Sequence, residues 1–323
     1  MRSTVVLIIF VLSLSSRASA EQTFFIADSW VSGFTYGFFG NKEQRFKNAW
    51  KRANRTAAND VKIWAGLFAS DRSKKFGGRG WETLSRFTWQ LPQTAIGLTY
   101  AHFENTLGGN VDSVRYFHGS TVLIGRHGLF YDIGGPAVTL SNYIVGNGSL
   151  RASADNYILQ HEYGHYLQSQ ATGIAYFGRI AIPNIRSEHG DYQKLYKSHD
   201  YHPTEQDANR RAFLYMNRRI DQFRDDSSYS ASPSLLNQGW DFVRNPLFQC
   251  GVPVNAARRP FDYVNYSNPG HVASLEKLRV KAKWYDYVFP IVSGFYNSYR
   301  YNNPKHDRKE PANKQEDTLV GSR

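Results

Sequence analysis

The stretch QHEYGHYLQ at positions 160–168 decides how this 323-residue chain is interpreted. It places His161 and His165 four residues apart, with Glu162 directly after the first histidine. On a helix, side chains at i and i+4 lie on one face, so the two imidazoles can bind one metal ion. Glu162 is rotated by about 100° from His161, where its carboxylate can contact a water on that ion and act as a general base. The spacing therefore predicts a zinc-ligating helix.

A zinc site that works on a substrate needs a third protein ligand. The extended pattern with a third histidine is excluded, because Gln168 and Ala171 occupy its glycine and histidine positions. The best candidate is Glu205, an oxygen ligand in the first turn of the next expected helix. Asn209, one turn further on, is expected to bond a ligating histidine. The competing ligands are His or acidic residues of the same region: Asp207, His202, His189 and Glu188.

HEYGH followed by Glu205-x-x-x-Asn209 resembles a gluzincin-type zincin metallopeptidase. The chain is also similar to uncharacterised bacterial proteins and to C-terminal modules of Rhs/YD-repeat proteins, over the segments 109–112, 160–170 and 205–211. The family has Asp four residues after the ligand Glu, and here Asn209 stands in that place. The resemblance implies a zincin-like fold, one Zn²⁺ per chain and a peptide or protein substrate.

The N-terminus has the pattern of a secretory signal peptide. Arg2 precedes the apolar run Val5–Leu12, and the small residues Ala18–Ala20 form a cleavage site. The run is much shorter than the roughly twenty residues that span a bilayer. We therefore expect residues 1–20 to be removed, the protein to be secreted or periplasmic, and no transmembrane segment to remain.

The charge and the cysteine content limit the classes of partner and the kinds of metal site that the chain can have. The net charge is +12, so an anionic envelope surface is a candidate partner, although a solvated basic surface is the simplest interpretation. No nucleic-acid-binding motif is present, and we expect no nucleic acid partner. Cys250 is the only cysteine, which excludes an intramolecular disulfide and a metal site of several thiolates. We expect Cys250 to be a packed residue.

Hydrophobic periodicity predicts an α+β fold, mainly helical, with a small mixed β-sheet beside the HExxH helix. The expected helices are 41–68 with a break near 59–60, 81–90, 93–104, 156–170 capped by Asp155, and 204–223 capped by Thr204. The expected strands are 114–116, 121–124 and 137–145. The glycines at 77, 78 and 80 predict a loop, and 174–203 is expected to be irregular.

The long first helix has a regular apolar face. Its members recur every three or four positions: Phe46, Trp50, Ala53, Ala57, Val61, Trp64 and Phe68. We expect one domain over 21–301, with an N-terminal helical part at about 21–107, and a disordered tail at 302–323. A boundary near 108 is the alternative.

These features predict a zinc-dependent peptidase in which Glu162 takes a proton from the attacking water. The edge of strand 137–145 is a candidate site for a peptide substrate. The tetrahedral oxyanion needs a hydrogen-bond donor besides zinc. Four residues before Glu205 could supply it, and none is assigned: Tyr201, His202, His199 and His189. The tyrosines Tyr143, Tyr163 and Tyr166 are expected in the core. The rival hypotheses are a non-catalytic envelope-binding protein and a secreted toxin or effector peptidase.

Overall fold

The computed structural model describes residues 25–40, 44–125, 137–154, 156–187, 199, 202–219 and 279–301. Its helices are α2 (Phe25–Gly40), α3 (Arg45–Ala65), η1 (Gly66–Phe68), α4 (Phe76–Arg86), α5 (Leu91–Thr106), α7 (Tyr157–Thr172), η2 (Phe177–Ala181), α8 (Ile182–Ser187), α10 (Pro203–Arg219), α14 (Trp284–Val288) and α15 (Pro290–Tyr301). The expected leader, the tail, Cys250, Glu188, His189 and Tyr201 lie outside the described residues. No described helix has both the length and the hydropathy to cross a bilayer.

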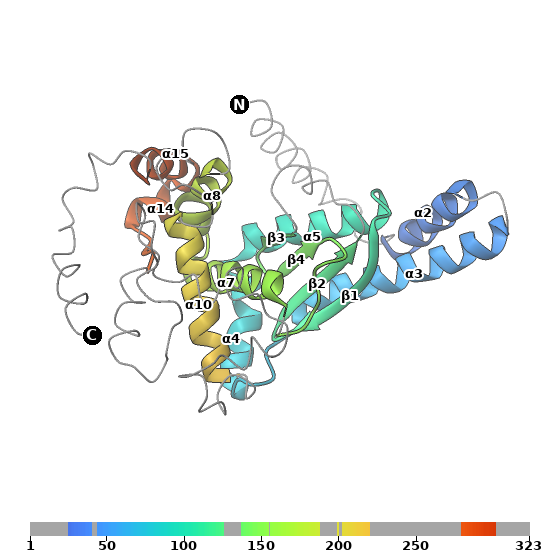
Figure 1. Cartoon of the computed structure of the whole chain (residues 1–323), viewed down its shortest axis with the longest axis horizontal. Helices are drawn as coiled ribbons and strands as arrows, with labels where there is room; N and C mark the ends of the chain where they lie inside the picture. Colours follow the sequence, from blue (N-terminus) through green and yellow to red (C-terminus); the bar gives the residue numbers. More distant parts are fainter. Residues whose placement is uncertain are drawn as a thin grey trace, which may run out of the picture.

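A four-stranded mixed sheet lies at the centre of the described fold (Figure 1). Its strands are β1 (Val111–Phe117), β2 (Ser120–Gly125), β3 (Ala137–Leu140) and β4 (Tyr143–Gly146), in the order β1-β2-β4-β3. The pairs β1–β2 and β3–β4 are antiparallel, and β2–β4 is parallel. The prediction of a mainly helical α+β protein with a small mixed sheet is confirmed, and β3 lies at one edge of that sheet.

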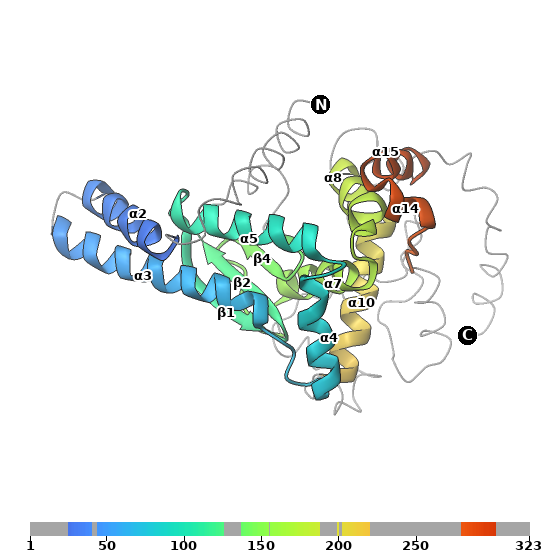
Figure 2. The same ribbon diagram turned by 180° about the vertical axis from the view of Figure 1, so that it is seen from behind.

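The alternation of side chains along the strands builds a core on each face of the sheet. Leu123, Tyr143 and Val145 pack with residues of α3 and α5. Val122 and Ile144 point the other way and pack with residues of α7 and α10. The helix pair α7–α10 is therefore held against one face of the sheet, with α3 and α5 on the opposite face (Figure 2).

The first long helix departs from its prediction in two ways. α3 runs unbroken through Asn59 and Asp60, because both side chains find buried partners. Asn59 Nδ2 donates to the Val111 carbonyl at 3.2 Å, and Asp60 Oδ1 lies 2.6 Å from His102 Nδ1. The buried face carries Ala49, Ala53, Thr56, Asn59, Asp60 and Ile63, whereas Phe46, Trp50, Val61 and Phe68 of the predicted apolar face are exposed.

The expected loop at residues 77–80 is the first part of α4, so that prediction is wrong. The helix forms despite its glycines because Arg86, at its end, is tied to the rest of the fold. Its buried guanidinium donates to the carbonyls of Gly66, Leu67, Ala69 and Gly119. These tertiary bonds outweigh the low helix propensity of glycine.

The predicted strand 137–145 is a hairpin, with β3 and β4 joined by a two-residue turn at Ser141-Asn142. Ser141 has a φ of +56°, and its hydroxyl lies 2.8 Å from that of Thr94. Asn142 Nδ2 donates to the Gly66 carbonyl. Ser-Asn is a turn-forming pair, so the sequence carried a signal for this bend.

Helix boundaries in the second half also differ. α7 is capped by Asn156, whose side chain accepts from Leu159 N, and not by Asp155. α10 begins at Pro203, which suits a first helical position, so Thr204 lies inside it and is not the cap. Gly173 follows α7 with a positive φ. Part of the expected irregular segment is helical, as η2 and α8, because α15 packs on both.

A buried carboxylate joins three segments that lie far apart in the sequence. Asp71 accepts hydrogen bonds from Ser73 and from the Tyr215 hydroxyl of α10, and it lies 2.9 Å from His118 Nδ1 in the β1–β2 turn. Burial alone would raise the pKa of Asp71, but the bonds with His118, Tyr215 and Ser73 hold it well below its usual range. The ionised form of Asp71 is therefore the one that stabilises the fold.

We predict that Asp71→Asn lowers the free energy of unfolding by about 2–4 kcal/mol at neutral pH. A depressed folded pKa contributes stability above the unfolded value of about 4, and that contribution is lost as the pH falls toward the folded value. The deficit of the variant relative to the wild type should therefore shrink below about pH 4. Urea titrations at several pH values measure it, with the exposed Asp28→Asn as control. A deficit that is constant with pH contradicts the assignment.

Candidate metal centre

The helices α7 and α10 approach one another unusually closely. A Cβ on Gly164 would overlap the carbonyl group of Ala208, so only glycine permits this distance between the two backbones. Gly164 lies inside the HEYGH stretch, between His161 and His165. The close approach brings the first turn of α10, with Glu205, opposite the two imidazoles.

Three potential ligand atoms converge between these helices. Glu205 Oε2 lies 2.8 Å from His161 Nε2, and Glu205 Oε1 lies 3.4 Å from His165 Nε2. The two Nε2 atoms are 3.3 Å apart. All ligand atoms of the group lie within 4.8 Å of one another, which is close enough to hold one metal ion.

Each histidine uses its other nitrogen to bond an amide oxygen. His161 Nδ1 lies 2.9 Å from Asn209 Oδ1, and His165 Nδ1 lies 2.8 Å from Gln168 Oε1. Because these amide oxygens accept, Nδ1 carries the hydrogen in both rings, and the lone pair of Nε2 is left for an ion. Asn209 thus makes the contact with a histidine that its place one turn after Glu205 predicts.

Asp207, the main competing ligand, does not face the group. Its oxygens accept from Gln168 Nε2 at 3.0 Å and from the guanidinium groups of Arg210 and Arg211 at 2.8 Å. The Gln168 amide also donates to the Thr204 carbonyl, which fixes its orientation. Asp207 therefore positions the residue that orients His165, and it is not one of the three residues whose ligand atoms converge.

The charges within the group are strongly coupled. Burial alone would lower the pKa of His161, but the negative charge of Glu205 outweighs burial and raises that pKa to about 10. His165 is shifted in the same direction for the same reason. Burial alone would raise the pKa of Glu205, yet the neighbouring imidazolium charges hold it well below its usual range. A divalent cation would replace the protons that these rings carry.

The buried carboxylate fits a metal better than it fits a protein partner. Both oxygens of Glu205 are buried, and no described residue donates a well-aligned hydrogen bond to them, although His161 Nε2 lies at hydrogen-bond distance. Two neutral imidazoles and one carboxylate are a ligand set that zinc accepts. Among the described residues the group offers three ligand atoms, so a bound zinc ion would keep a fourth position for water.

Glu162 points to the sheet side of α7. Thr139 Oγ1, on the edge strand β3, donates to Glu162 Oε2 at 2.6 Å and lies 3.0 Å from the Glu162 carbonyl oxygen. Thr139 thereby fixes the carboxylate next to His161 and leaves its second oxygen for another partner.

The remaining described candidates are two histidines, which were possible oxyanion donors, and three tyrosines. His199 Nε2 lies 3.6 Å from Glu205 Oε2, and its Nδ1 lies 2.6 Å from the Ser187 hydroxyl, so it borders the group without joining it. His202 is buried, and burial lowers its pKa to about 3. The tyrosines Tyr143, Tyr163 and Tyr166 are fully buried, as predicted.

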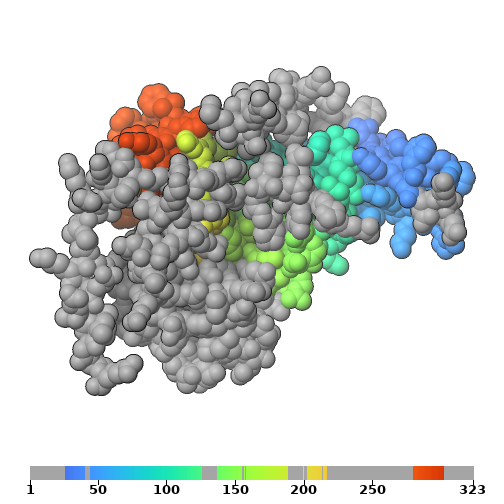
Figure 3. Space-filling view, turned by 45° about the horizontal axis from the view of Figure 1, so that its top comes forward, coloured from blue at the N-terminus to red at the C-terminus, as the bar shows by residue number. Residues whose placement is uncertain are grey.

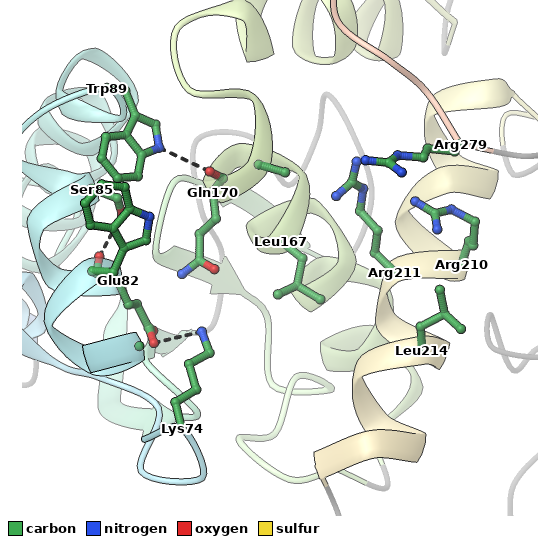
Figure 4. Close-up of a pocket in the computed structure, with 13 residues that line it drawn as sticks. Lys74, Glu82, Ser85, Trp89, Leu167, Gln170, Arg210, Arg211, Leu214 and Arg279 are labelled. Carbon is green, nitrogen blue, oxygen red and sulfur yellow. Dashed lines mark hydrogen bonds and ion pairs between the residues drawn. The ribbon is translucent and has the colours of Figure 1, made fainter. Parts of the chain in front are cut away.

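A pocket of about 610 Å³ is lined by residues of α4, α7 and α10 (Figure 4). Gln170 is rotated by about 180° from His161 on the helix, and it forms part of the pocket wall. Trp89 borders one side and Arg211 the other. None of the three converging residues lines this pocket.

Sequence reasoning found His161, His165, Glu205 and Asn209 but missed Thr139 and Gln168. Gln168 carries a detectable signal, since it lies three residues after His165 on the same helix. Thr139 carries none, because its contact with Glu162 depends on the packing of β3 against α7.

Comparison with known proteins adds no assignment. No protein-family model matches the chain, and no curated protein or solved structure matches it. The geometry of the site therefore carries the functional proposal.

We predict that Gly164→Ala separates α7 from α10 and moves Glu205 away from the imidazoles. The free energy of unfolding should fall by about 2–4 kcal/mol, and metal affinity should fall at least about tenfold. Chemical denaturation and calorimetric metal titration measure the two effects. Gly148→Ala is the matched control, because a Cβ there meets no atom within 4 Å. Unchanged metal affinity in Gly164→Ala would show that the close helix contact does not set the site.

We predict that Glu205→Gln holds much less than one metal ion per chain, whereas Asp207→Asn still holds about one. The amide of the first variant is a poorer ligand of the same shape, and the second removes no ligand. Elemental analysis after dialysis against a metal buffer gives the stoichiometry, with circular dichroism as the folding check. The reverse pattern would make Asp207 the ligand and overturn the assignment of Glu205.

Proposed function

We propose that the protein is a secreted, zinc-dependent peptidase with a zincin-like fold. The convergence of His161, His165 and Glu205 beside Glu162 is the observation that supports it most directly. Ligands of this type leave zinc a position for water, and they occur in hydrolases rather than in closed structural sites. The HEYGH stretch and Glu205-x-x-x-Asn209 supply the family resemblance.

In this proposal His161, His165 and Glu205 would hold Zn²⁺, which when bound acidifies water and polarises the scissile carbonyl. Glu162 takes the proton of the attacking water and then passes it to the leaving amine. Thr139 holds one oxygen of Glu162 in place, so the other oxygen serves as the base. Asn209 and Gln168 keep each imidazole in the tautomer that a metal needs.

The edge strand β3 is the proposed binding site for the substrate backbone. Among the described residues β3 pairs only with β4, and Thr139 of β3 contacts Glu162 directly. A peptide that adds to β3 as a further strand would place its backbone alongside the general base. The small sheet thereby links substrate position to the metal-ligating helix.

We predict that Glu162→Gln retains zinc and the fold but lowers kcat for peptide hydrolysis at least about 100-fold, because the amide cannot accept the proton. Cleavage of a peptide library by the zinc-loaded protein, read by mass spectrometry, is the assay. Asp112→Asn, an isosteric change of a half-buried carboxylate on β1 that pairs with Arg55, should keep wild-type activity.

Equal activity of Glu162→Gln and wild type would exclude the general-base role. Zinc at one ion per chain with no hydrolysis of any peptide would favour the rival envelope-binding protein. Growth inhibition on expression that Glu162→Gln abolishes would identify the peptidase as a toxin or effector.

A further inference from the structure

The helical hairpin α2–α3 is packed with its small side chains inside. Gly33 and Gly37 of α2 are buried against Ala53 and Ala49 of α3, and Ser29, one turn before Gly33, is buried as well. A Cβ on either glycine would overlap the backbone of α3, so the close contact requires both glycines. Because the interface is filled by small residues, the large apolar side chains of the hairpin point elsewhere.

Those large side chains form a continuous aromatic surface across both helices. Trp30 and Phe34 stack with ring centroids 5.4 Å apart, and Phe34 and Phe38 follow at 6.2 Å. Rings of α3 complete the surface, with Trp50 against Trp30 and Phe46 against Phe38. Phe46 and Trp50 are the first two members of the apolar face that the sequence shows on α3.

Much of this aromatic surface is exposed. Phe39 is 79% exposed, Phe46 72% and Trp50 58%. A water-soluble helix hairpin normally buries such side chains, and contiguous exposed apolar patches mark interaction sites. The hydrophobic core of the sheet gains nothing from these three residues.

A band of positive charge runs beside the aromatic surface. Lys47 and Lys51 directly follow Phe46 and Trp50, so each lies about 100° round α3 from the ring before it. Both lysines are exposed, and neither forms an ion pair with a described residue. α3 carries six basic residues and a single acid, Asp60, which is buried beside His102.

The hairpin lies at one end of the described fold. Figures 1 and 2 show α2 and the first half of α3 extending past the sheet. In the space-filling view the hairpin forms the blue end of the molecule (Figure 3). A flat partner can therefore reach the aromatic surface without meeting the metal centre.

We propose that the α2–α3 hairpin docks on an anionic lipid bilayer, with its aromatic side chains inserted at the interface and its lysines at the lipid headgroups. Small residues between helices and large apolar residues outside are the arrangement that lipid favours. Exposed phenylalanines beside lysines match the two faces of an interfacial helix, and the lysines complement anionic headgroups. This inference is independent of the proposed peptidase activity.

Flotation of the full chain with vesicles tests the proposal. Wild type should float with vesicles rich in phosphatidylglycerol and bind pure phosphatidylcholine vesicles more weakly. The variant Phe39→Ser/Phe46→Ser/Trp50→Ser should lose binding at least about tenfold. Lys47→Gln/Lys51→Gln should bind the anionic vesicles roughly 10- to 30-fold less, with little change on neutral vesicles.

A matched control removes equally exposed rings from another part of the surface. Phe68→Ser/Phe76→Ser/Trp284→Ser deletes two phenylalanines and a tryptophan that are 67%, 88% and 73% exposed. All variants keep the same first twenty residues, so differences among them report the hairpin. Circular dichroism verifies folding, and the double lysine variant serves as the test if the triple aromatic variant does not fold.

Several results would overturn the proposal. They are no flotation of wild type, an equal loss in the control variant, and hairpin variants that bind like wild type. Binding to nucleic acid without binding to vesicles would assign the surface to a different polyanion. Self-association that the hairpin substitutions abolish, without vesicle binding, would make the surface an interface between copies of the chain.

Discussion

The whole site depends on one contact between two backbones. Where α7 meets α10, the absence of a side chain at Gly164 lets the carbonyl group of Ala208 approach, and Glu205 reaches the imidazoles only because of it. The sheet also packs against α7, through the core cluster that contains Ile144. The geometry of the candidate metal site is therefore set by helix packing, and not by the HEYGH stretch alone.

A series of hydrogen bonds between buried polar groups connects the packed helices to the candidate ligand atoms and fixes their orientation. Asp207 is neutralised by two arginines, fixes the amide of Gln168, and through it sets the ring of His165. A buried charge lowers the stability of the fold unless it is paired, and here the charge of Asp207 is paired with those of the two arginines. The third ligand differs, since the oxygens of Glu205 lie among imidazoles without an aligned donor, which leaves them suited to a cation.

The sequence predicted what is local and missed what is tertiary. The spacing of His161 and His165 follows from helix geometry, and Glu205 was found because it opens the next helix. The role of Thr139 was not predictable, since β3 and α7 meet only in the fold. Glycines at the start of α4 suggested a loop, but the bonds of Arg86 hold a helix there. Helix starts and stops were the least accurate predictions, because buried partners decide them.

The continuity of α3 has a mechanical consequence. Its first half belongs to the hairpin and its second half covers the sheet, so a rigid rod of about 31 Å joins the two without a hinge. Whatever the far end touches fixes the tilt of the sheet as well. If the hairpin binds a bilayer, the candidate metal site would therefore lie at a fixed distance above the membrane surface. Peptide bonds at that distance would then be the ones that reach the site most often.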